Sequence, residues 1–243
     1  MKKITSIIYF HLFTFVRSTK GVMPLTFLIL LQLMLYLGIQ RRPTNFLDSI
    51  FLAEIFVFVI AIWLGYASNN WTDVITEQLL ILRIKSDKVY RSIYVVFLFL
   101  VSACISLISI SIPAIINLLD WRMFERFSIT YFSQSFLLFL GSGFAGISLG
   151  ALFHSRLMVK DGEKPLYAAG AGLLSITRYS IVNQYGIFNY ILWIFPNVSA
   201  HHSILSDHSY FTFLNVTSLF LINLFYGVIY SIIKIVLLSK KKF

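Results

Sequence analysis

Residues 68–90 read SNNWTDVITEQLLILRIKSDKVY, the longest charged interruption in a chain that is otherwise mostly apolar. The stretch follows one long apolar run and precedes another. It mixes acidic and basic side chains with large aliphatic ones, and a simple linker would not need so many aliphatics. Because exposed aliphatics ringed by charge suit the groove of a partner, the pattern predicts a cytoplasmic helix that docks onto another protein.

The composition of the 243 residues is that of a membrane protein. Apolar residues make up 58% of the chain and charged residues 12%, against roughly 25% charged in soluble domains. The formal net charge is +10, but no basic stripe lies on a soluble face, so we expect no nucleic-acid partner. The single cysteine, Cys104, excludes an internal disulfide and any multi-cysteine metal site.

Six apolar stretches predict an all-α integral membrane protein with six transmembrane helices in one domain, residues 1–243. About 20 apolar residues at 1.5 Å each cross roughly 30 Å of hydrocarbon. The fifth stretch is the least secure, because it contains Arg178, and Pro113 in the third predicts a kink or a stop. The expected spans are about 22–40, 50–67, 92–116, 129–153, 165–182 and 213–238.

Two further segments favour the membrane surface. In residues 1–20, Ile4, Ile8, Leu12 and Phe15 share one face of a helical wheel and the basic residues fall on the other, as in an interfacial amphipathic helix. Between the fifth and sixth spans, the apolar residues 187–195 are too few to cross a membrane, so we expect short re-entrant or interfacial helices there.

The positions of the basic residues predict the orientation. With six spans both termini share one side of the membrane, and fifteen of the 20 basic residues lie on that side or at its edge. Because basic residues gather in cytoplasmic loops, we expect both termini in the cytoplasm of a multi-pass cell-membrane protein. The fifteen are Lys2, Lys3, Arg17, Lys20, Arg83, Lys85, Lys88, Arg91, Arg156, Lys160, Lys164, Lys234, Lys240, Lys241 and Lys242; the others are Arg41, Arg42, Arg122, Arg126 and Arg178.

Small and polar residues inside the spans are candidates for packing or for a transport pathway. Serines hydrogen-bond to neighbouring helices or line a polar face, and Gly146 and Gly150 allow close helix approach. Ser148 also matches a nucleophile elbow, but it lies within a span, so packing is the favoured interpretation. The pathway candidates are Ser102, Ser106, Ser109, Phe139 and Ser142.

The ionisable residues leave more than one interpretation open. Glu54, near the start of the second span, is either functional or a carboxylate that reaches the aqueous end. His201, His202 and His208 could bind a metal, although a solvated outer loop is the expectation. No convergent catalytic residues and no bound metal are predicted.

Taken together, these features resemble the transmembrane subunit of a type-2 ABC exporter. The resemblance rests on the amphipathic N-terminal helix, the short hairpin at 185–205, and the segment ITEQLLILRIKSDKVYRSIYVVF, whose acidic residue, leucine run, Ser and basic residue fit the outline of the family's coupling helix. It covers the whole chain, but each local motif is weak. It implies a separate cytoplasmic ABC ATPase that carries ATP and Mg, and a second permease copy, identical or different.

On a helical wheel, Ile75, Leu79 and Leu82 form one stripe, which we expect to pack on the bundle. Leu80 and Ile84 fall on the opposite side and are expected to face the ATPase. The chain has no phosphate-binding G-x-x-x-x-G-K-[ST] loop, so it is not expected to be an enzyme. The predicted docking residues are Asp73, Glu77, Leu80, Arg83, Ile84, Lys85 and Ser86.

Other functions remain open from the sequence. A secondary transporter or channel predicts ionisable groups deep in several spans, and a membrane-embedded enzyme predicts converging catalytic groups; a structural membrane partner is a further possibility. A pathway with few charges favours an amphipathic or lipid-like substrate, such as an antimicrobial or toxic peptide in export or self-immunity.

Overall fold

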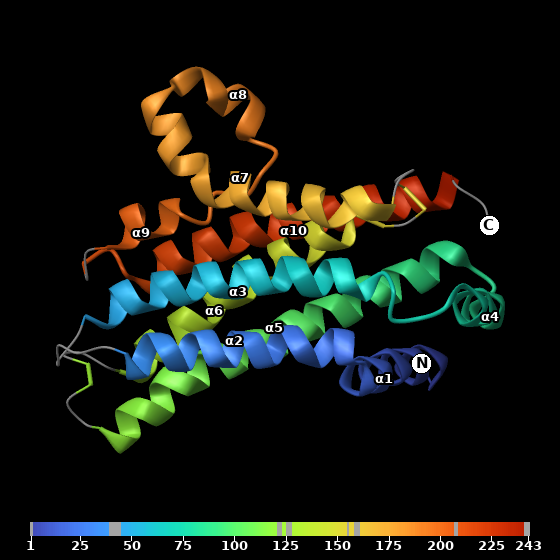
Figure 1. Cartoon of the computed structure of the whole chain (residues 1–243), viewed down its shortest axis with the longest axis horizontal. Coiled ribbons are helices and arrows are strands. Elements are labelled where there is room, and N and C mark those ends of the chain that lie inside the picture. Colours follow the sequence, from blue (N-terminus) through green and yellow to red (C-terminus); the bar gives the residue numbers. More distant parts are fainter. Residues whose placement is uncertain are drawn as a thin grey trace.

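The computed structural model describes residues 2–38, 45–120, 123–124, 128–154, 156–157, 161–206 and 209–240, without the side chains of Lys2, Lys3 and Asp161. Some predictions fall on residues outside the described ones. They concern the span end at 39–40 and the residues Arg41, Arg42, Arg122, Arg126, Lys160, His208, Lys241 and Lys242. The described chain is helical (Figure 1), with α1 (Lys2–Arg17), α2 (Thr19–Leu37), α3 (Phe46–Ser68), α4 (Val74–Ile84), α5 (Asp87–Leu119), α6 (Ile129–Ala151), α7 (Lys164–Gln184), α8 (Asn189–Leu192), α9 (Ala200–Leu205) and α10 (Phe213–Lys240).

Among the described residues, five helices are long and apolar enough to cross a membrane: α2, α3, α5, α6 and α10. The chain is therefore a multi-pass membrane protein. The fifth predicted span forms α7, which has a suitable length of 21 residues but, with Lys164 and Arg178, is not apolar enough to count among the five. Pro113 lies inside the 33-residue α5, so it does not stop that helix.

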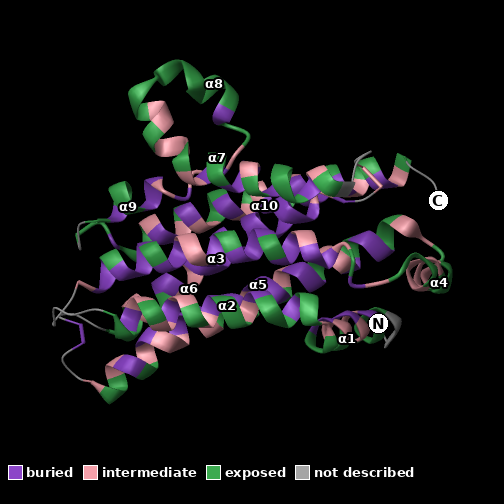
Figure 2. Ribbon diagram, in the orientation of Figure 1, coloured by how far each residue is buried: buried purple, intermediate pink, exposed green. Residues whose placement is uncertain are grey.

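Helices α3 and α6 form the centre of the bundle, and most of their residues are buried (Figure 2). Their backbones meet at glycines: a Cβ on Gly146 would lie 2.7 Å from the carbonyl oxygen of Phe58, and one on Gly150 would overlap that of Ile62. Packing through Gly146 and Gly150 is thus confirmed. Ser148 is buried between helices, 3.3 Å from the hydroxyl of Ser231 on α10.

The chain between α7 and α10 forms a hairpin that stands out from the side of the bundle at α8 (Figure 1). It contains the 3₁₀ turn Gly186–Phe188, α8 and α9, so the prediction of short helices here is confirmed. Tyr226 of α10 donates to the carbonyl oxygen of Trp193 at 2.6 Å, and Arg178 of α7 donates to that of Phe195. These bonds satisfy backbone carbonyls where the chain has no regular helix.

Helix α1 packs against α5, with Ile7, His11 and Phe15 buried. On the predicted apolar face, Phe15 is buried against the bundle and Ile4 is 45% exposed, so the interfacial position of α1 stays a prediction. The ring of His11 lies among the aromatic rings of Tyr90, Tyr94 and Phe97.

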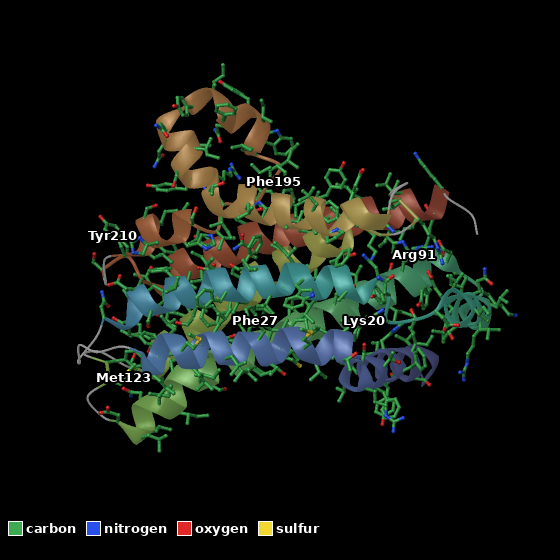
Figure 3. The ribbon with its side chains drawn as sticks, viewed as in Figure 1. Lys20, Phe27, Arg91, Met123, Phe195 and Tyr210 are labelled. Atoms are coloured by element: carbon green, nitrogen blue, oxygen red, sulfur yellow. The ribbon has the colours of Figure 1, made fainter. Side chains whose placement is uncertain are left out.

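The two ends of the bundle differ. Both termini and α4 lie at one end (Figure 1), where Figure 3 also marks Arg91, and Met123 and Tyr210 mark the opposite end. At the opposite end a group of aromatic rings closes the bundle, with centroids 5.0 to 6.5 Å apart; it comprises Tyr36, Phe46, Phe51, Phe124, Tyr131 and Phe211.

The glycine contacts predict a position-specific sensitivity to an added methyl group. Gly150→Ala places its Cβ against the backbone of Ile62, so it should destabilise the detergent-solubilised protein by about 1–3 kcal/mol. Gly170→Ala is the matched control, because nothing lies within 4 Å of a Cβ there and alanine favours the helix by up to about 1 kcal/mol. Thermal unfolding measures both; equal midpoints for the two variants would contradict the close α3–α6 contact.

Candidate functional site

Helix α4 lies across the end of the bundle and is seen nearly end-on in Figure 1. It begins after Asp73, which occupies the N-cap position, and it ends at Lys85, whose φ of 63° is left-handed. A left-handed residue at the end of a helix turns the chain sharply. Ser86 then accepts a hydrogen bond from the amide of Val89 at 3.4 Å and begins α5. The predicted helix between the second and third spans therefore exists as α4.

The faces of α4 are the reverse of those predicted from the wheel. Leu80 and Ile84, with Ile81, pack against a buried cluster of Ile7, Tyr90 and Ile93. Ile75, Leu79 and Leu82 are exposed by 68%, 61% and 71% instead. The wheel separates the two stripes correctly, but α1 and α5, which cover one of them, lie elsewhere in the sequence.

Glu77 connects α4 to the bundle by charge. Its carboxylate lies 2.7 Å from the guanidinium of Arg156, which follows α6, and 3.8 Å from that of Arg91 on α5. Arg91 also contacts Asp87 at 2.8 Å. The Glu77 side chain is only 12% exposed, so it is a contact within this chain and does not belong to the outer surface of α4.

Lys234 of α10 joins the same region from the other side. Its ammonium donates to the side-chain oxygen of Asn69 at 2.9 Å and lies 4.9 Å from the ring centroid of Tyr94. Tyr94 in turn donates to the carbonyl oxygen of Ser68 at 2.7 Å. The end of α3, α5 and α10 are thus tied together next to α4, around a cavity of about 40 Å³ that Glu77 and Arg91 also line.

His154 follows α6 and is uncharged at neutral pH. Burial, together with the nearby cations Lys234 and Arg156, lowers the pKa of His154 from 6.5 to about 3. Its Nδ1 accepts the backbone N–H of Arg156 at 3.1 Å, which requires an unprotonated nitrogen. A neutral His154 therefore helps to position Arg156 toward Glu77.

Some of the other predicted docking residues are exposed, and one caps a helix. Asp73, Arg83 and Lys85 are exposed. Ser86 serves as the cap of α5. Of the predicted set, Leu80, Ile84 and Glu77 face the protein. The aliphatic residues on the outward surface of α4 are therefore those that the wheel assigned to the bundle.

The predicted pathway residues lie buried between helices. Ser102 and Ser106 donate to carbonyl oxygens of their own helix, at 3.0 and 2.8 Å, and a Cβ on Gly143 of α6 would contact both. Ser109 and Phe139 are also fully buried. Ser142 is different, because its hydroxyl donates to Glu54.

Glu54 and His201 are the residues whose role the sequence left open, and the structure brings them together. Glu54 is 1% exposed and lies eight residues inside α3, so it does not reach water at the helix end. His201 Nδ1 lies 2.6 Å from its carboxylate, so the expectation of a solvated loop is wrong for His201. No group of three or more His, Cys, Asp or Glu among the described residues could hold a metal ion.

Comparison with family models, curated proteins and solved structures finds no match to this chain. Its function is therefore inferred from the residues and their geometry.

Glu77 and Arg156 should show a measurable energetic coupling. In a double-mutant cycle with Glu77→Gln and Arg156→Gln, we expect a coupling of about 1–3 kcal/mol in thermal unfolding, because both partners are largely buried. A second cycle, Glu77→Gln with Arg83→Gln, is the control, since Arg83 is exposed and should show no coupling beyond error. Equal coupling in the two cycles would mean that the contact with Arg156 does not hold α4.

His154 should make the protein less stable in acid. Because the folded-state pKa is about 3 and the ordinary value 6.5, the unfolded chain takes up a proton between these values that the folded chain does not. The stabilisation is complete above pH 6.5 and is lost as the pH falls towards 3; at pH 5 the loss is about 1–2 kcal/mol. In thermal unfolding, the stability of the His154→Gln variant should fall less between pH 7 and pH 5 than that of the unsubstituted protein, by about this amount. An unchanged decline would contradict a neutral, buried His154.

Proposed function

We propose that this chain is the permease subunit of an ATP-driven ABC exporter, and that two permeases work with two cytoplasmic ATPases. The observation that carries the proposal is α4: a short helix across the end of the bundle that presents Ile75, Leu79 and Leu82 outward. Exposed aliphatics of this kind on a membrane protein fit the groove of a soluble partner. ATP and Mg would be bound by that partner.

The contacts beneath α4 support a mechanical role. A displacement of α4 would act through Glu77 on Arg91 of α5 and on Arg156 at the end of α6. Lys234 extends the connected region to α10. Closure of the ATPases would thus move several helices together, since packed elements shift between discrete arrangements and do not deform continuously.

Both termini would be cytoplasmic in the cell membrane, with α7 as the sixth crossing. In support, both termini lie at the same end of the bundle (Figure 1), as an even number of crossings requires. The hairpin around α8 exposes Ile187, Tyr190 and Trp193 by 58% or more, an apolar surface that suits a second permease copy. An interior of apolar residues and serines with few charges favours an amphipathic or lipid-like substrate, such as a toxic peptide.

A second candidate is a secondary transporter or channel that does not use ATP. The burial of Glu54 at membrane depth favours it, because ionisable residues there mark ion or proton pathways. The two candidates differ in whether an ATPase binds to α4.

Substitutions on the outward face of α4 distinguish the two. We expect Leu79→Asp and Leu82→Asp to insert and fold normally, because both positions are exposed, but to lose the ATPase. Each variant is purified from the source cells. The measurements are whether a subunit with a G-x-x-x-x-G-K-[ST] loop co-purifies with it and whether the preparation hydrolyses ATP. Lys88→Asp is the matched control: it adds an acidic residue at a nearby exposed position outside α4. ATPase recovery from both leucine variants equal to that from the control would contradict the proposal.

A further inference from the structure

Four polar side chains from four helices meet inside the bundle, away from α4. Glu54 of α3 accepts a hydrogen bond from Ser142 of α6, and His201 Nδ1 of α9 lies 2.6 Å from the same carboxylate oxygen. Asn223 of α10 donates to the Ser142 hydroxyl at 3.1 Å. All four residues are at most 3% exposed.

The cluster lies deep enough that its net charge matters. Glu54 is eight residues from the start of α3, about 12 Å along the helix axis at 1.5 Å per residue. Asn223 is ten residues from the start of α10, about 15 Å by the same measure. A single uncompensated charge at such a depth costs several kcal/mol, so the cluster is stable only when it is neutral overall.

Among the described residues, Glu54 forms an ion pair with His201 alone. Helix α6 carries no Asp, Glu, His, Lys or Arg over Ile129–Ala151. On α10 the nearest is Lys234, eleven residues beyond Asn223, or about 16 Å along the axis. On α3 and α9, Asp48 and His202 pair with each other at 3.7 Å, with side chains 62% and 57% exposed. One proton shared between Glu54 and His201 is therefore what makes the cluster neutral.

The site suits a proton better than a larger ligand. Ser142 already uses its hydroxyl as donor to Glu54 and as acceptor from Asn223. The side-chain oxygen of Asn223 is buried without a hydrogen-bond partner among the described residues. Proton binding needs no empty volume and no rearrangement of these contacts.

We propose that Glu54 and His201 form a proton-binding site whose occupancy holds α9 on the bundle. The proton moves between a neutral pair, Glu54 carboxylic acid with neutral imidazole, and an ion pair, carboxylate with imidazolium. When the imidazolium gives its proton to water, the carboxylate is left buried with charge −1, and α9 separates to admit water. The exposed His202–Asp48 pair, on the same two helices, connects the site with the aqueous phase opposite α4.

The proton site goes beyond the proposed export function, because its ligand is a proton and not a partner protein. It applies whether ATP or an ion gradient drives the chain. Besides His201, α9 is held by Leu205, which is buried in the core, and at its edge by His202, whose ring centroid lies 5.3 Å from that of Phe51. Phe51 is one turn from Glu54 and 4% exposed, so separation of α9 would open the aromatic end of the bundle.

Thiol labelling tests whether α9 follows the proton. Cys104 is the only cysteine of the sequence, so Cys104→Ala gives a cysteine-free protein. In that background, Val198→Cys places a thiol two residues before α9 at a site that is 2% exposed, and Ser203→Cys gives an exposed reference on α9. The rate of maleimide labelling of the Val198→Cys variant is divided by the rate for the Ser203→Cys variant, which removes the intrinsic pH dependence of the thiol.

With Glu54 present, we expect this ratio to rise about tenfold or more as the pH is raised and the pair loses its proton. Glu54→Gln keeps the acceptor oxygen but cannot titrate, so its ratio should stay constant. Glu163→Gln, a substitution of the same kind at the start of α7, should keep the original profile. A constant ratio with Glu54 present, or the same rise in Glu54→Gln, would overturn the proposal.

A second variant covers the case in which Glu54→Gln does not fold. His201→Asn removes the imidazole, so Glu54 has to hold the proton alone and the pH at which the ratio rises should move. A profile identical to that of the unsubstituted protein would equally overturn the proposal.

Discussion

The close contact between α3 and α6 is the constraint on which the rest of the structure depends. Backbones approach within van der Waals contact of each other only where no side chain intervenes, and Gly65, Gly146 and Gly150 provide this. The contact fixes the distance between Glu54 on α3 and Ser142 on α6. It also places the end of α3 beside α5 and α10, so that Ser68 and Asn69 can bond with Tyr94 and Lys234.

The two polar sites of the bundle follow different physical rules. Beside α4, the carboxylate of Glu77 has two guanidinium partners. The three side chains are 8% to 17% exposed, so these paired charges keep some contact with water. Around Glu54 the side chains are almost fully buried, and among the described residues histidine is the only ionisable partner. The geometry of this chain therefore separates a charged network beside α4 from a buried polar cluster around Glu54.

Much of the fold could be predicted from local patterns. The apolar runs predicted the five helices that are long and apolar enough to cross a membrane, and the charged stretch at 68–90 predicted α4. Local features also explain two differences among the predicted spans. Helix α5 continues through Pro113 to Leu119, and α7 is less apolar than the five other long helices because it carries Lys164 and Arg178. The candidate site was predicted less well: the stripes on α4 were recognised, but their orientation was reversed.

The sequence by itself determined that this chain is a multi-pass helical membrane protein with a charged, aliphatic-rich helix after its second span. These properties are local, since hydrocarbon thickness sets the length of an apolar run and the helical period sets the stripes. Only the tertiary structure decided that Leu80 and Ile84 of α4 face inward, and that His201 reaches Glu54 over a separation of 147 residues. Such contacts depend on which helices lie side by side, and that is decided by packing across the whole bundle.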